Sequence, residues 1–181
     1  MIDRGANDWN DAMIAAAADG HQEIVDQMIE HGADDWDLAM KAAADGGHQE
    51  IVNQMILRGA DNWDGVMRVA AGSGRQEIVN QMIQRGANYW NPAMEAAAGG
   101  GHQEIVNQMI QRCADKRNAS MTWVRRNVWN HAMIEAAGGG HLEIVNQMIQ
   151  NGVNALDDAI TAAARGGHQE IVKILIDAAI N

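Results

Sequence analysis

The sequence contains no phenylalanine and only one tyrosine, one proline and one cysteine, although 47% of its 181 residues are apolar. Any core must therefore be built from methionine, alanine, isoleucine and tryptophan, and the chain has 12 Met and 6 Trp. With 19 glycines, scarce proline and many alanines, the composition is typical of short helices that end at glycine. This excludes an all-β fold, and the apolar content excludes a disordered chain.

Basic residues are also scarce, because 13 Lys and Arg face 24 Asp and Glu, for a net charge of −11. Such a surface repels polyanions, so a general nucleic-acid clamp is excluded. The lone Cys113 allows no internal disulfide and fits a reducing compartment. The start of the chain has no basic region leading into an apolar run, and no stretch approaches about 18 apolar residues. We therefore expect a cytoplasmic protein without a membrane segment.

An internal repeat dominates the chain. The phrase HQEIVNQMI, with small changes, begins at His21, His48, Arg75, His102, His141 and His168. The spacing is 27 residues except for one interval of 39, which holds 12 extra residues. A second phrase, WNxAMxAAA or a close variant, precedes each copy and begins at Trp9, Trp36, Trp63, Trp90, Trp129 and Leu156. We predict a single array with a partial repeat at 1–4 and repeats at about 5–31, 32–58, 59–85, 86–112, 113–151 and 152–181.

Each repeat is predicted to form two helices. In the second repeat the first helix spans about Leu38 to Asp45 and ends at two glycines, and the second spans His48 to Arg58 and ends at Gly59. The residue after each Trp is always Asn or Asp, which predicts a helix N-cap at Asn10, Asp37, Asp64, Asn91, Asn130 and Asp157. The apolar stripe of the second helix is too wide to be buried by one hairpin. Neighbouring repeats must cover it, so we predict an all-α solenoid of six 27-residue helix-turn-helix repeats.

The pattern AAxxGHxEIVxxMIxxGA resembles the helical core of an ankyrin repeat, as segments 43–52, 97–106 and 163–172 show best. The resemblance covers nearly the whole chain. Two features depart from that family: its Thr-Pro-Leu-His opening is replaced by forms such as Leu38-Ala39-Met40-Lys41, and the period is 27 where the family has 33. The missing residues fall where ankyrin repeats place a β-hairpin finger, so we predict no developed fingers. The Trp-containing phrase also resembles divergent ankyrin arrays of large DNA viruses of amoebae, which would place the protein in an infected host cell.

Signals for catalysis or cofactor binding are weak. The repeated histidines are separated by whole repeats, too far apart to share one metal ion, and a structural role at the start of the second helix is favoured. The few Ser, Thr and Cys residues occupy no recognisable nucleophile setting, and the glycine-rich turns follow helices and lack Gly-Lys-Ser/Thr. We predict no enzymatic activity, no metal and no cofactor. The Trp column forms either a buried spine, which we favour, or a row of binding anchors.

Positions that vary between copies are candidates for partner binding. Two of them, the second and fifth residues after each Trp position, are three residues apart and share one face of the first helix; the residue before each Trp also varies. The alternative is that these positions lie on a solvent-exposed surface and vary by sequence drift without any binding role. This reasoning predicts a non-enzymatic protein-interaction module with partner-binding residues Leu38, Lys41, Arg68, Tyr89, Glu95 and His131.

The 12-residue insertion adds a second candidate region. Between residues 112 and 126 the net charge is +4, against −15 for the rest of the chain. This segment adds Lys116, Arg117, Trp123, Arg125 and Arg126 to the predicted partner-binding residues. An acidic protein partner is the main interpretation, RNA binding is the alternative, and a tolerated surface insertion is the third. Because Cys113 replaces the usual glycine, we expect the second helix to continue past it, with Ser120 capping a short helix through Met121, Trp123 and Arg126; a hairpin over Met121 to Val124 is the alternative.

The ends of the array are the last feature. Residues 1–6 match the end of a second helix, which predicts either a fragment of a longer array or an uncapped first repeat. The last helix is the most apolar of its kind. We therefore predict a homodimer, or a self-assembling structural protein, through Ile174, Ile176, Ala179 and Ile180 or through the face of Met13 and Ile24.

Overall fold

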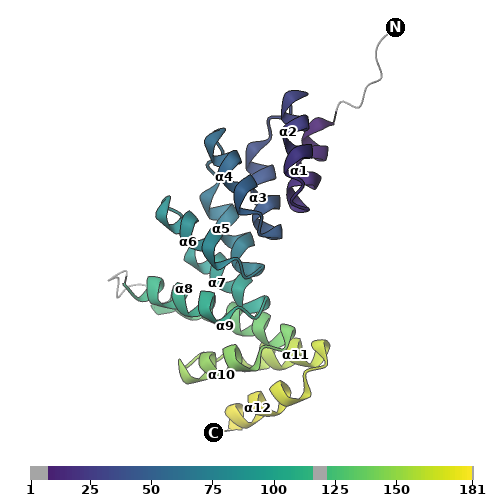
Figure 1. Cartoon of the computed structure of the whole chain (residues 1–181). Helices are drawn as coiled ribbons and strands as arrows, with labels where there is room; N and C mark the ends of the chain where they lie inside the picture. Colours follow the sequence, from purple (N-terminus) through teal and green to yellow (C-terminus); the bar gives the residue numbers. More distant parts are fainter. Residues whose placement is uncertain (1–7, 116–121, 181) are drawn as a thin grey trace. The chain divides into compact units, whose positions relative to one another are not determined.

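A computed structural model describes residues 8–115 and 122–180, and residues 113–115 and 122–128 are described by their backbone alone. These residues form twelve α-helices in successive pairs, and no strand occurs among them (Figure 1). The chain divides into two compact units, Met1–Ala87 and Asn88–Asn181. The prediction of an all-α fold of helix-turn-helix repeats without β-hairpin fingers is confirmed.

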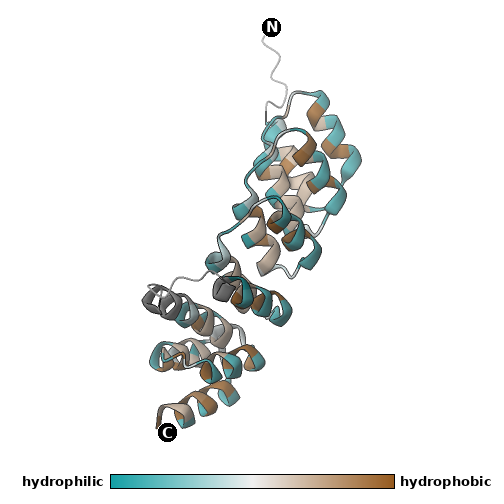
Figure 2. Cartoon of the chain, turned by 90° about the vertical axis from the view of Figure 1, so that its left-hand side faces the viewer, coloured by the Kyte–Doolittle hydropathy of each residue, from teal (hydrophilic) through white to brown (hydrophobic). Residues whose placement is uncertain are grey.

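In the first unit the three first helices pack side by side, and each also packs against its own second helix (Figure 1). The first helices are α1 (Trp9–Ala18), α3 (Trp36–Gly46) and α5 (Trp63–Gly72). The second helices are α2 (Gln22–Glu30), α4 (Gln49–Leu57) and α6 (Gln76–Gln84). Figure 2 shows hydrophilic and hydrophobic residues alternating along these second helices, as expected of amphipathic helices packed on one side.

The second unit repeats this arrangement, with its first helices again in one layer. The first helices are α7 (Trp90–Gly99), α9 (Thr122–Gly139) and α11 (Leu156–Gly166), and the second helices are α8 (Gln103–Asp115), α10 (Leu142–Gln150) and α12 (Gln169–Ile180). As expected, α8 continues past Cys113. Within the insertion the chain differs from the prediction: residues from Thr122 onward are not a separate short helix, because α9 runs unbroken through Trp129. Ser120, the predicted cap, lies outside the described residues.

Methionine fills the core between the two layers. Met13, Met40, Met67, Met94 and Met133 of the first helices and Met55, Met82, Met109 and Met148 of the second helices are all 0% exposed. Alanines such as Ala43 and Ala44, also fully buried, let the helices approach closely. Because Met13 is inside this core, the prediction that it forms part of a dimer face is wrong.

The helix starts also differ from the prediction. Each capped first helix begins at its Trp, or at Leu156 in the last repeat, so the N-cap is the residue before it and not the residue after it. Asp35 and Asn62 accept hydrogen bonds from the backbone N–H of Leu38 and Gly65. The predicted glycine stop is present, because Gly59 has a φ of 107°, a conformation that favours glycine.

Candidate interaction surface

In the first two repeats, the Asn or Asp after the Trp binds the following repeat. One carboxylate oxygen of Asp37 accepts hydrogen bonds from the backbone N–H groups of Asp61 and Asn62, at 2.9 and 3.0 Å. One repeat earlier, Oδ1 of Asn10 accepts hydrogen bonds from the backbone N–H groups of Asp34 and Asp35, at 2.8 and 3.0 Å. The side chain therefore fixes the loop that leads into the next first helix. In this fold it provides a link between successive loops where no β-hairpin finger is present.

The histidine column also joins successive repeats. Nε2 of His48 lies 3.0 Å from the carbonyl oxygen of Ala18, and Nε2 of His168 lies 3.0 Å from that of Gly138. A carbonyl oxygen only accepts, so the ring nitrogen carries the proton and donates. Arg75, which replaces histidine in the third repeat, donates from Nε to the carbonyl oxygen of Asp45. The predicted structural role of these residues agrees with these contacts.

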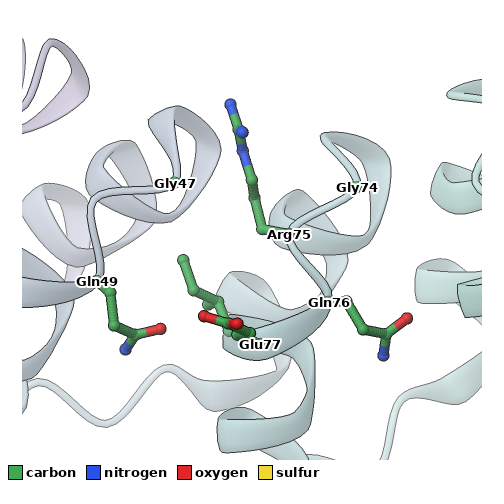
Figure 3. A pocket seen from close by; sticks show the side chains of 7 residues that line it. Gly47, Gln49, Gly74, Arg75, Gln76 and Glu77 are labelled. Atoms are coloured by element: carbon green, nitrogen blue, oxygen red, sulfur yellow. The ribbon is translucent and has the colours of Figure 1, made fainter.

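A shallow hollow of about 300 Å³ lies beside this contact in the first unit. Figure 3 shows the Arg75 side chain extending between the turns that contain Gly47 and Gly74. The hollow is lined by Gly47, Gln49, Gly74, Arg75, Gln76, Glu77 and Ile78. A similar hollow of about 230 Å³ lies one repeat earlier. Their linings contain no Ser, Thr or Cys nucleophile, and both follow from the repeat geometry.

Amide side chains of the second helices form a hydrogen-bonded ladder that the sequence analysis did not predict. Nε2 of Gln49 donates to Oε1 of Gln81 at 2.7 Å, and Nε2 of Gln81 donates to Oδ1 of Asn53 at 2.7 Å. The same pattern joins Gln22, Gln54 and Asp26, and it joins Gln103, Gln147 and Asn107. The signal in the sequence was that the same three polar residues recur at the same positions in most second helices. A helix face that contacts only water does not require particular polar residues, so their recurrence indicated a specific contact.

The fifth and sixth repeats carry apolar residues at the matching ladder positions. Leu142 stands where Gln49 stands in the second repeat, and Ile174 stands where Gln81 stands in the third. Both members of the pair change together. A single apolar replacement would leave the other amide without its partner, whereas a paired replacement removes both polar groups.

We expect the ladder to show this coupling in a double-mutant cycle. Gln81→Ile should lower the free energy of unfolding by about 1–2 kcal/mol, because Gln49 and Asn53 lose their partner. Gln49→Leu combined with Gln81→Ile should lower it by less than the sum of the two single changes, with a coupling of at least about 0.5 kcal/mol. Urea unfolding followed by circular dichroism measures all four variants. Additive losses would show that the ladder carries no interaction energy.

Each Trp of the first four repeats is half-buried and covered by a residue from the end of its own second helix. The guanidinium groups of Arg58, Arg85 and Arg112 lie 5.3, 5.2 and 5.6 Å from the ring centres of Trp36, Trp63 and Trp90. His31 stacks on Trp9 with ring centres 4.7 Å apart. These cation–π and stacking contacts join the start of the first helix to the end of the second helix within the same repeat. They favour the spine interpretation of the Trp column, and they give Arg112, part of the basic segment, a structural partner.

The variable positions of the first helices reach solvent in every copy. The second residue after each Trp position is half-buried or exposed in all six repeats, and so is the fifth. These positions are Asp11, Leu38, Gly65, Pro92, His131 and Asp158, and Ile14, Lys41, Arg68, Glu95, Ile134 and Thr161. We call these positions, taken within each unit by itself, the variable face. By contrast, the alanines and methionine between them in each helix are mostly fully buried.

The predicted partner-binding residues fall in four groups, of which the pair Glu95 and His131 is described last. Leu38 is 48% exposed on α3, with Lys41 on the same helix and Arg68 on the neighbouring α5. Tyr89, at the N-cap of α7, is 63% exposed. The side chains of Lys116, Arg117, Trp123, Arg125 and Arg126 lie outside the described residues.

Glu95 and His131 contact each other across two repeats. Nδ1 of His131 lies 3.5 Å from Oε1 of Glu95, which joins α7 to α9 on the variable face. Burial raises the pKa of Glu95 above its usual 4.5, the nearby Glu135 raises it further, and His131 acts in the opposite direction. Two predicted site residues are therefore brought together, with a second carboxylate beside them.

This raised pKa predicts a pH dependence of stability. The folded state holds the Glu95 proton more tightly than the unfolded state, so the free energy of unfolding should fall as pH rises through the raised pKa. Solvent screening limits the fall to a few tenths of a kcal/mol. Urea unfolding across the acidic range should show the fall in the wild type and not in Glu95→Gln. Glu104→Gln, on an exposed residue, is the control, and a fall that persists in Glu95→Gln would contradict the assignment.

Other chemistry finds little support among the residues that the structure describes. They hold no group of three His, Cys, Asp or Glu side chains placed to bind a metal ion. Within the same residues, no helix combines the length and apolar character needed to cross a membrane. The side chains that converge in the two units are amides, histidines and the stacked Trp–Arg pairs described above.

Comparison with known proteins agrees with this fold. No protein-family model and no curated protein matches the sequence. Among solved structures, the chain is similar to the human ASB11 ankyrin repeat domain, with a TM-score of 0.62 and 21% sequence identity. The similarity covers 93% of this chain and 84% of that one. The chain therefore has an ankyrin-type repeat fold.

Proposed function

We propose that this protein is a non-enzymatic protein-interaction module whose variable face binds a protein partner. One observation carries the proposal. Most residues that are constant between copies are buried or join repeats, and the constant exposed Glu in the first turn of each second helix complements the helix dipole, whereas the variable first-helix positions all reach solvent. Structural needs therefore account for the constant residues and leave the variable face available for recognition. The sequence resemblance and the absence of a predicted membrane segment favour the cytoplasm, that of an infected host cell if the viral resemblance holds.

The experiment compares capture by three forms of the chain. The face variant carries Leu38→Ala, Arg68→Ala and His131→Ala, all on exposed side chains. The control variant carries Glu23→Gln, Glu50→Gln and Glu143→Gln, exposed residues at the starts of second helices. A photocrosslinking residue at the exposed position 11, which none of the three forms otherwise changes, identifies bound proteins by mass spectrometry. Partners retained by the wild type and the control but lost by the face variant support the proposal, and partners lost equally by both variants oppose it.

The basic insertion belongs to the proposal as a second contact region, with Lys116, Arg117, Trp123, Arg125 and Arg126 as its residues. RNA binding through the same residues is the alternative. A salt titration separates the two, because binding to phosphates weakens steeply with salt concentration. RNA binding with a steep slope that is lost when these basic residues become alanine would favour the alternative.

Self-association is a second candidate, because α12 exposes two isoleucines. Ile176 is 43% exposed and Ile180 is 79% exposed, and Ala179 between them is also exposed. Burial of these side chains against a second copy would remove apolar area from water. Light scattering at micromolar concentration tests this: a mass above 19.6 kDa that falls on dilution supports self-association, and a constant 19.6 kDa opposes it.

A further inference from the structure

The first unit holds two cations that no contact within the fold explains. Of its described arginines, Arg58 and Arg85 cover Trp rings, and Arg75 donates to the carbonyl oxygen of Asp45. Lys41 and Arg68 make no hydrogen bond, ion pair or ring contact with any described residue. Carboxylates lie four residues away on the same helices, Asp37 and Asp45 from Lys41 and Asp64 from Arg68, yet neither cation forms an ion pair with them.

These two cations occupy the same position in adjacent repeats. Lys41 and Arg68 are exactly one 27-residue period apart, on α3 and α5, which pack side by side. Packed helices lie about 8–10 Å apart, so the two charges form a short row across the variable face. The remaining first helix of this unit, α1, carries Ile14 at the equivalent position.

Aliphatic side chains surround this row. Leu38 is 48% exposed one turn before Lys41, and Ile14 and Val69 are half-buried. Carboxylates lie around it: Asp11 on α1, Asp37 and Asp45 on α3, Asp64 on α5, and Asp34, Asp35 and Asp61 in the loops that precede α3 and α5. The centre of the face is therefore basic and aliphatic, and its loop edge is acidic.

We propose that the partner presents to this face an acidic segment with aliphatic side chains, its carboxylates pairing with Lys41 and Arg68 and an aliphatic side chain packing on Leu38. This inference rests on the proposed function and adds the chemistry of the partner. Paired charges on an interface give specificity and speed association. A nucleic-acid strand fits less well, because the part of this face in the first unit offers no aromatic ring for base stacking.

The test is a selection of random peptides displayed on phage against the full chain. Selected peptides should be enriched in Asp and Glu together with Leu, Ile or Val. Synthetic copies should bind Lys41→Ala/Arg68→Ala at least about tenfold more weakly than the wild type. Arg165→Ala removes an exposed arginine on α11 of the second unit and is the matched control, for which no change is expected. Circular dichroism confirms that each variant is folded.

Other outcomes separate the failure of this inference from that of the proposed function. Peptides that are not acidic, or that are weakened by Leu38→Ala or His131→Ala but not by Lys41→Ala/Arg68→Ala, would overturn the inference and leave the proposed function standing. Peptides that bind all these face variants as tightly as the wild type would overturn both. Single-stranded RNA of random sequence is a parallel probe. RNA binding that depends on Lys41 and Arg68 would show that the two cations bind phosphate groups, and it would overturn the proposal of an acidic peptide segment.

Discussion

Replacing Gly46 with alanine should lower the free energy of unfolding by about 2–3 kcal/mol. Gly46 is the last residue of α3 and its φ is not positive, so backbone strain is not the cause. A Cβ atom at this position would meet the carbonyl oxygen of Ala18 and would lie 2.5 Å from Nε2 of His48. Those two atoms form the hydrogen bond between the first and second repeats. The added methyl group must therefore separate the repeats or displace the histidine.

Gly99→Ala is the matched control and should have the opposite sign. Gly99 is the last residue of α7, and a Cβ atom there would lie 3.6 Å from its nearest neighbour, Cβ of Glu135, which is ordinary contact. Alanine favours the helix over glycine, so the change should raise the free energy of unfolding by about 0.5–1 kcal/mol. Urea unfolding of both variants checks the pair. A loss at Gly99 as large as that at Gly46 would show that the histidine contact is not the reason for glycine.

Met55→Ala should lower the free energy of unfolding by about 2–5 kcal/mol, because the side chain is 0% exposed and its removal leaves a cavity between the helix layers. Met28 occupies the same position in the first repeat but is only half-buried, so Met28→Ala should cost less than half as much. Met55→Leu should cost less than about 1.5 kcal/mol. The last repeat already carries a fully buried leucine, Leu175, at this position.

The same urea unfolding curves test this prediction. If Met55→Ala and Met28→Ala cost equally, burial would not determine the contribution of the methionine column. If Met55→Leu costs as much as Met55→Ala, the position would require methionine itself and not its volume. Either result would contradict a core held together by the volume of its aliphatic side chains.

The sequence predicted features that a single repeat determines. The two helices, the left-handed glycine at Gly59 and the buried alanines and methionines all follow from the 27-residue pattern and local propensity. The helix start was placed two residues late because Asp37 has the side chain of a good N-cap. In the structure its carboxylate instead binds the loop of the next repeat, and Asp35 caps the helix.

Contacts between repeats were much harder to predict. The partners in the Gln49–Gln81–Asn53 ladder are 28 and 32 residues apart, so their geometry depends on how adjacent helices align. The contact between Glu95 and His131 crosses the 12-residue insertion and depends on the same alignment. The variable positions, by contrast, were correctly expected on the surface of the first helix, because variation between copies does not require knowledge of packing.

The central claim is that most of the constant residues hold the repeats together and that the variable residues of the first helices are available to bind a partner. A protease-resistance scan of single substitutions throughout residues 32–58 tests it most directly, since this repeat is flanked by neighbours within the first unit. The account predicts large stability losses at Met40, Gly46, His48 and Met55 and changes within about 0.5 kcal/mol at Leu38, Lys41 and Leu57. Losses at Leu38 and Lys41 as large as those at Met40 and His48 would contradict it.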